Sequence, residues 1–171
     1  MSTAAPSGPE DCNCLAVRRA ARRITQFYDH LLAPSGLRTT QFSILAKLRR
    51  PEPITINALA ADLVMDRTTL GRNIRPLERD GLITIAKGSR DRRSKALRLT
   101  AAGEARFRVA AKAWAQAQRQ FAAALGAKCT IHLRTLLRAV AATELGTADV
   151  GDEKSFSGPR IMSPRRDARR G

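Results

Sequence analysis

The sequence holds too little of several residue types for most kinds of catalysis. It has two histidines, His30 and His132, which stand about a hundred positions apart. We find no paired carboxylates on a common helical face, no phosphate-cradling glycine loop, no Ser-His-Asp set and no three-ligand metal spacing. We therefore expect a binding protein, with no enzymatic activity, cofactor or metal.

Long apolar runs are also missing. No stretch approaches the roughly 20 apolar residues that span a bilayer. The first residues have neither the charged start nor the apolar segment of a secretory signal. We expect a cytoplasmic protein with no membrane partner. In that reducing compartment, the three cysteines are not expected to form a stable disulfide.

Acidic residues are scarce beside basic ones. The chain has 31 Lys and Arg against 15 Asp and Glu, a formal net charge of +16. Residues 12–145 hold 25 of the basic and 9 of the acidic residues, so the excess belongs to the folded part. A basic folded body implies an acidic partner. Nucleic acid is the favoured partner, and an anionic membrane surface is the alternative.

The length of 171 residues fits one domain. Residues 1–11 and 146–171 are rich in Gly, Pro, Ser and charge and poor in aliphatic residues, so we expect a mobile N-terminal segment and a disordered basic tail. Residues 12–145 then form the folded domain.

Between these ends the periodicity is mostly helical. Apolar residues at three- and four-residue steps predict a first helix of about 18 residues from Cys14, ended by Pro34 and Gly36. Shorter helices are expected at about 40–48 and 57–64. A long helix capped by Thr100 follows further on, and a last helix is expected at about 130–144.

The segment 66–81 is predicted to be a helix with two different faces. Leu70, Ile74 and Leu77 fall on one stripe at 100° per residue, and Asp66 stands at the N-cap position. The opposite face carries four polar or basic side chains: Thr68, Arg72, Arg75 and Arg79. Such a helix has the shape and charge to enter the major groove of DNA.

A hairpin is predicted directly after this helix. Residues 82–86 and 95–100 alternate and are rich in aliphatic side chains, which is typical of strands. The tip between them carries the cations Lys87, Arg90, Arg92 and Arg93. Asp91 stands among these cations, and we expect it to orient Arg93.

Together these elements predict a mainly α (α+β) chain with a winged helix-turn-helix reading head at about 54–100. The helices at about 12–33 and 101–145 carry more apolar surface than a lone subunit can bury, so we expect them to form a homodimer interface. Two reading helices roughly 34 Å apart would suit a palindromic site. A nonspecific architectural binder of nucleic acid is the alternative, because the net charge alone attracts any polyanion.

Residues 14–145 resemble the MarR family of winged-helix regulators. The resemblance is carried by LRTTQFSIL at 37–45, MDRTTL at 65–70, LERDGLI at 77–83, DRR at 91–93 and LTAAG at 99–103. It implies a homodimeric transcription factor, commonly a repressor, whose affinity for double-stranded DNA changes with a small phenolic ligand or with cysteine oxidation. It also implies that Thr68, Thr69 and Arg72 contact DNA from the recognition helix, and Asp91 and Arg93 from the wing.

The resemblance extends to a sensor site. In the organic-hydroperoxide sensors of this family, a peroxidatic cysteine matches Cys14 and a tyrosine matches Tyr28. Cys129 resembles a second cysteine near the last helix of some members. The chain departs from that pattern at Arg18 and Phe42, where further tyrosines are expected.

The sequence leaves other readings of these residues open. In one interpretation Cys12 and Cys14 bind a soft metal, although two thiolates supply only half of the usual four ligands. In the other, the three cysteines are small, partly buried and unreactive. Phe107, Trp114 and Phe121 on the long helix are either core residues or the lining of a pocket for a small aromatic effector.

Overall fold

The computed structural model describes residues 8–87 and 95–143. The mainly helical class and the winged helix-turn-helix are confirmed. The elements are η1 Pro9–Asp11, α1 Asn13–Leu32, η2 Ala33–Ser35, α2 Thr39–Leu48, β1 Ile54–Thr55, α3 Ile56–Asp62, α4 Arg67–Arg79, β2 Ile83–Lys87, β3 Lys95–Leu99, α5 Ala101–Leu125 and α6 Ala127–Ala142. The expected tail at 146–171 and the hairpin tip at 88–94 lie outside the described residues.

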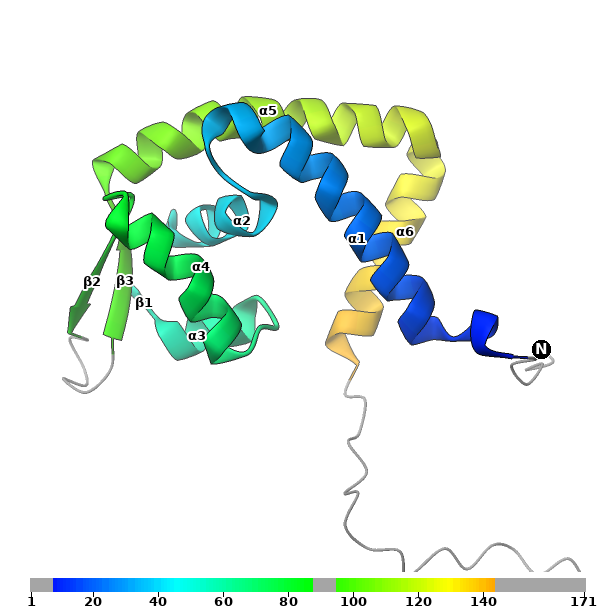
Figure 1. Ribbon diagram of the computed structural model, residues 1–171, viewed down its shortest axis with the longest axis horizontal. Coiled ribbons are helices and arrows are strands. Elements are labelled where there is room, and N and C mark those ends of the chain that lie inside the picture. The colour runs from blue at the N-terminus through cyan, green and yellow to red at the C-terminus, as the bar shows by residue number, and fades with distance from the viewer. Residues whose placement is uncertain (1–7, 88–94, 144–171) are drawn as a thin grey trace, which may run out of the picture.

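The long helix α5 links two groups of elements (Figure 1). Near its N-terminal half lie α2, α3, α4 and the sheet, and near its C-terminal half lie α1 and α6. No helix in the described ranges is long and apolar enough to cross a membrane.

The small sheet has the order β1-β3-β2 and is antiparallel throughout. Ile83 pairs with Leu99 and Ile85 with Leu97, which fixes the register of the hairpin. Ile83 and Leu97 are fully buried, so one face of the sheet belongs to the core. β1, which the sequence analysis did not predict, pairs Ile54 with Leu97. A strand of two residues is too short to show alternation.

One apolar core holds the reading head together. Its members come from the end of α1, from α2, α3 and α4, from the sheet, and from the first part of α5. The largest fully buried side chains are Leu32, Ile44, Leu45, Leu59, Leu70, Leu77, Ile83 and Leu97. Burial of this set fixes the orientation of α4, because the three buried residues of that helix, Leu70, Ile74 and Leu77, form one apolar stripe.

The last helix begins earlier than expected. α6 starts at Ala127, directly after Gly126, whose φ is +86°. Thr130, which we expected at the start of the helix, lies within it, and its hydroxyl donates to the carbonyl of Gly126 at 2.9 Å. The break between α5 and α6 therefore needs a single glycine.

The N-terminus of α5 is locked onto the turn that follows α4. The Thr100 hydroxyl donates to the carbonyls of Gly81 and Leu82, at 2.7 and 3.0 Å, and accepts from the Gly103 N–H at 3.0 Å. A Cβ on Gly103 would lie 2.0 Å from the Leu82 carbonyl oxygen. Only glycine permits this approach, so the orientation of α5 relative to α4 is closely defined.

Candidate nucleic-acid interface

Helix α4 has the two faces that the sequence predicts. Leu70, Ile74 and Leu77 are at most 2% exposed and point into the core. The five predicted contact residues on this helix are all exposed: Thr68, Thr69, Arg72, Arg75 and Arg79. A buried apolar stripe thus holds α4 while its cationic face remains open to solvent.

The start of α4 is fixed by its N-cap. The Asp66 carboxylate accepts from the Thr69 N–H at 2.8 Å. Hydrogen bonds from the side chain and the backbone of Thr69 hold the pKa of Asp66 below its usual value. The negative charge of Asp66 also complements the positive end of the helix dipole. Thr69 therefore supports the cap in addition to lying on the exposed face.

The turn before this cap is an αL C-cap of α3. The Met65 N–H donates to Ala60 and the Val64 N–H donates to Ala61, at 2.9 and 3.1 Å. This is the Schellman pattern, in which the residue in the left-handed region is usually glycine. Here it is Val64, with φ +51° and 77% exposure. The tight turn between α3 and α4 is therefore built on a strained residue.

The cations of α4 differ in how far they are neutralised. Arg79 pairs with the adjacent Asp80 at 3.0 Å. Arg72 and Arg75 form no ion pair with any residue that the structure describes. The middle of the exposed face is thus the part best able to pair with an external anion.

The predicted wing contacts Arg90, Asp91, Arg92 and Arg93 lie outside the described residues. The strands that carry them, β2 and β3, are in place on one side of α4 (Figure 1). Two exposed cations border the predicted set without belonging to it, Arg67 at the start of α4 and Lys95 at the start of β3. The sequence analysis did not include these two cations among the predicted contacts. Each stands at the first residue of its element, next to the predicted set, and this position could have identified it.

The three cysteines are free and exposed. Cys14 lies in the first turn of α1, after Cys12 at its N-cap, and Cys129 lies in the first turn of α6. Tyr28 is fourteen residues after Cys14 on the same helix, a separation of about 21 Å at 1.5 Å per residue. The two side chains therefore do not meet within one subunit. The described ranges contain no cluster of three or more metal-ligating residues.

The aromatic residues of α5 divide into two groups. Phe107 stacks on Phe42 with ring centroids 4.9 Å apart, and Trp114 stacks on Phe42 with centroids 5.9 Å apart. The Arg49 guanidinium covers the Phe107 ring at 4.6 Å. Phe107 and Trp114 thus pack against α2, which agrees with the interpretation of these two residues as part of the core. Phe121 lies apart from them, 6.4 Å from Tyr28.

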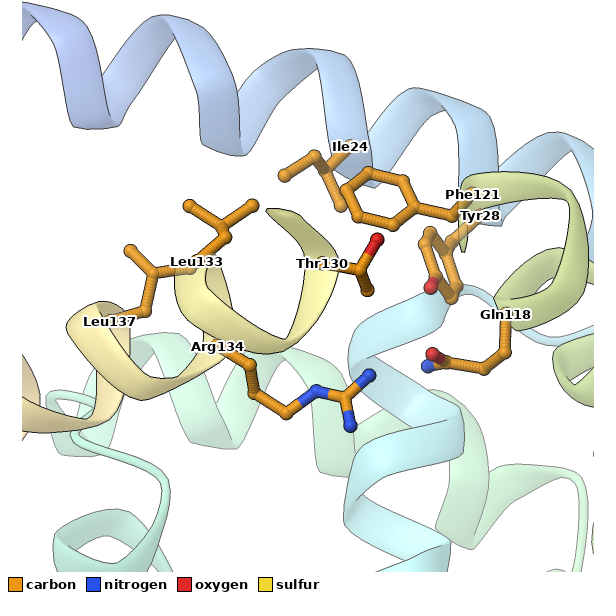
Figure 2. Close-up of a pocket in the computed structure, with 8 residues that line it drawn as sticks. All are labelled: Ile24, Tyr28, Gln118, Phe121, Thr130, Leu133, Arg134 and Leu137. Carbon is orange, nitrogen blue, oxygen red and sulfur yellow. The ribbon is translucent and has the colours of Figure 1, made fainter. Parts of the chain in front are cut away.

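Phe121 and Tyr28 belong to an open hollow between α1, α5 and α6 (Figure 2). The hollow has a volume of about 160 Å³. Its walls are formed by Ile24, Tyr28, Gln118, Phe121, Thr130, Leu133, Arg134 and Leu137. Burial raises the pKa of Tyr28, and the nearby positive charge of Arg134 partly offsets this effect. We call this feature the α1–α5–α6 hollow.

A comparison with known proteins agrees with this geometry. The MarR family profile matches residues 37–95. The Mycobacterium tuberculosis transcriptional regulator MosR, solved in complex with DNA, is 39% identical, with a TM-score of 0.66. The match covers 78% of this chain and 99% of that one. The chain belongs to the MarR family.

Two curated relatives support this membership over shorter segments. A Bacillus subtilis (strain 168) organic hydroperoxide resistance transcriptional regulator is 29% identical over 90 residues, 53% of this chain and 61% of that protein. The Rhodopseudomonas palustris (strain ATCC BAA-98 / CGA009) transcriptional activatory protein BadR is 34% identical over 80 residues, 45% of this chain and 46% of that protein. The chain thus matches about half to three fifths of these two relatives' lengths. This MarR-family protein has the winged helix-turn-helix fold of DNA-binding regulators.

Proposed function

We propose that this MarR-family protein is a sequence-specific transcriptional repressor that binds a palindromic operator as a homodimer. The observation that carries the proposal is the exposed face of α4, where Arg72 and Arg75 stand opposite a fully buried stripe. In the proposal α4 enters the major groove, and Thr68, Thr69 and Arg72 contact base edges. Arg75 and Arg79 contact phosphates. A cytoplasmic location follows from this role.

In the proposal the wing follows the DNA backbone or the adjacent minor groove. Arg90, Arg92 and Arg93 supply its charge, and Asp91 orients Arg93. The exposed Lys95 at the base of the wing adds a further phosphate contact.

The homodimer is supported by apolar surface on the helices away from the reading head. Five large aliphatic side chains of α1 and α6 are exposed by 42 to 64%: Val17, Ile131, Leu136, Leu137 and Val140. Apolar surface gathered in this way marks an interface. A second copy of the chain would cover it with an identical face, as a twofold axis requires. Sedimentation at micromolar concentration tests this, and a stable monomer would contradict it.

Regulation by an effector or by thiol oxidation is the second part of the proposal. Cys14 is exposed in the first turn of α1, so a dissolved oxidant can reach its sulfur. In a dimer, Tyr28 of one subunit can approach Cys14 of the other, which the length of α1 prevents within one chain. Hydroperoxide treatment of the wild type and of Cys14→Ser, followed by operator binding, tests this part.

The decisive test of DNA reading compares Arg72→Ala with Lys112→Ala, which removes one exposed cation from α5 instead. We expect Arg72→Ala to weaken operator binding by about 1 to 3 kcal/mol and to affect a random duplex less. Lys112→Ala should change neither strongly. Equal losses on both duplexes with Arg72→Ala would favour a nonspecific architectural binder instead. A reporter gene then separates repression from activation.

A further inference from the structure

We propose that an arginine-rich face of α1 is a second contact surface for the phosphate backbone of DNA, separate from the reading head. Its members are all exposed: Arg18, Arg19, Arg22 and Arg23. We call them the α1 arginine face. The inference rests on the proposed function, because it adds a sequence-independent contact to the same DNA complex.

The α1 arginine face lies opposite the apolar stripe of the same helix. At 100° per residue, the four arginines occupy a sector of about 140° on the side away from Val17 and Tyr28. Ile24 and Tyr28 of the stripe line the α1–α5–α6 hollow, so the stripe is directed toward α5 and α6. The exposed Val17, which we assign to the subunit interface, belongs to this stripe. The arginines therefore lie on the side of α1 that faces away from the proposed interface.

The α1 arginine face is strongly basic and little neutralised. The first acidic residue of α1 is Asp29, near the other end of the helix. Arg19 pairs with Glu10 at 3.6 Å, and both side chains are mostly exposed. The other three arginines form no ion pair with any residue in the described ranges. A second copy of this chain, with a net charge of +16, is a poor partner for such a face, whereas DNA is a matching polyanion.

The N-terminal half of α1 and the start of the reading helix lie on the same side of α5. In Figure 1, α5 runs along the top, and α1 descends from it until its N-terminal half reaches the level of α3 and the start of α4. The strands β2 and β3 extend from α5 in the same direction. A duplex that crosses the reading head along this lower side would therefore pass below the N-terminal half of α1.

The residues of this face favour nucleic acid over an anionic membrane, the competing partner. A helix that binds a membrane surface needs large apolar side chains beside its basic ones. Here the neighbours on the same side of α1 are Thr25 and Gln26, which are polar and exposed. Arginine binds phosphate oxygens through two parallel N–H groups. From Arg18 to Arg23 the helix rises about 7.5 Å, which matches about two phosphate steps of roughly 3.4 Å along one DNA strand.

The salt dependence of DNA binding by the full-length protein tests the proposal, with an operator selected from random sequences and with a random duplex. Each phosphate contact contributes about 0.9 to the slope of log affinity against log salt concentration. We expect Arg18→Gln/Arg22→Gln to reduce this slope by about 1 to 2 on both duplexes. Arg18→Lys/Arg22→Lys keeps both charges and should retain most of the slope. The matched control is Lys112→Gln/Arg119→Gln, which removes two exposed cations from α5 and should leave the slope unchanged.

Three slopes would contradict the proposal. The first is a wild-type slope in the glutamine pair on α1. The second is an equal decrease in the α5 control, which would reflect net charge alone. The third is an equal decrease in the lysine pair, which would indicate that the arginines have a structural role.

Two further measurements identify the other partners. Weaker self-association of the glutamine pair in sedimentation would place the α1 arginine face in the subunit interface. Weaker binding to phosphatidylglycerol vesicles, with a wild-type slope on DNA, would make it a membrane contact. Either result would overturn the proposal. If the wild type bound no duplex, the proposed function would fail together with this inference, whereas a wild-type slope in the glutamine pair refutes the inference alone.

Discussion

Two glycine substitutions test the junction between α5 and the reading head. Gly103 lies in the first turn of α5, and Gly71 lies within α4. Replacing either with alanine gains helix propensity, worth up to about 1 kcal/mol. The two sites differ in the space around the added methyl group. A Cβ on Gly71 meets nothing within 4 Å, whereas a Cβ on Gly103 would lie 2.0 Å from the Leu82 carbonyl oxygen and 2.7 Å from Leu99 Cδ1.

The magnitude at Gly103 follows from what would have to move. The nearest atom is a backbone oxygen, which cannot rotate away as a side chain can. The Leu82 carbonyl also accepts from the N–H and the hydroxyl of Thr100, at 3.1 and 3.0 Å. Overpacking of this kind costs about 1 to 3 kcal/mol and would stretch these hydrogen bonds as well. We expect Gly103→Ala to lower the free energy of unfolding by about 2 kcal/mol net.

Urea unfolding followed by circular dichroism measures both variants against the wild type. All three must be compared at one protein concentration, because self-association shifts apparent stability. Gly71→Ala should raise the free energy of unfolding by about 0.5 to 1 kcal/mol. If Gly103→Ala stabilised the protein as much as Gly71→Ala does, the close contact between α5 and Leu82 would be refuted.

Two further predictions concern the helix-turn-helix itself. Val64→Gly should raise the free energy of unfolding by about 1 kcal/mol, because it relieves a side chain held in the left-handed region; unchanged urea unfolding would show that the turn is unstrained. The pKa of Asp66 is lowered in the folded state. Its contribution to stability is therefore complete above the pKa of the unfolded chain and is lost as the pH falls through the folded value. Asp66→Asn keeps a capping oxygen but should flatten this acid dependence below about pH 4, the ordinary pKa of an aspartate, when unfolding is measured against pH. If Asp66→Asn and the wild type showed the same pH dependence of unfolding, the negative charge of Asp66 would not contribute to the N-cap.

The sequence predicted those parts of the fold that depend on local periodicity and capping. The buried stripe of α4 recurs at helical spacing, so its inward and outward faces could be assigned residue by residue. The caps Asp66 and Thr100 were identified because each stands directly before an amphipathic run, and both accept the expected backbone N–H. DNA contact by the outward face stays a prediction.

The features that sequence reasoning missed depend on contacts between distant segments. Gly103 looks like a weak helix residue until its approach to Leu82 is seen. The α1–α5–α6 hollow joins Tyr28 to Arg134 across more than a hundred positions of the chain, and no spacing rule reports such a pairing. The sequence also left two interpretations of Phe107 and Trp114 open, core residues or the lining of a pocket. The contact that favours the core is again a distant one, because Phe42 of α2 stacks on both rings.

These contacts also provide a physical route from the hollow to the reading helix. Gln118 and Phe121 lie near the end of α5, and the start of the same helix is held by Thr100 to the turn that follows α4. Tyr28 is adjacent to Asp29 on α1, and the Asp29 carboxylate accepts from the Thr39 N–H of α2 at 2.7 Å. A ligand that moves α1 relative to α5 therefore acts on both attachments of the reading head. In a dimer that reads two half-sites about one DNA turn apart, a small rotation of each α5 changes the separation of the two α4 helices. We therefore expect any effector that moves α1 relative to α5 to change affinity for the two-half-site operator more than affinity for a single half-site.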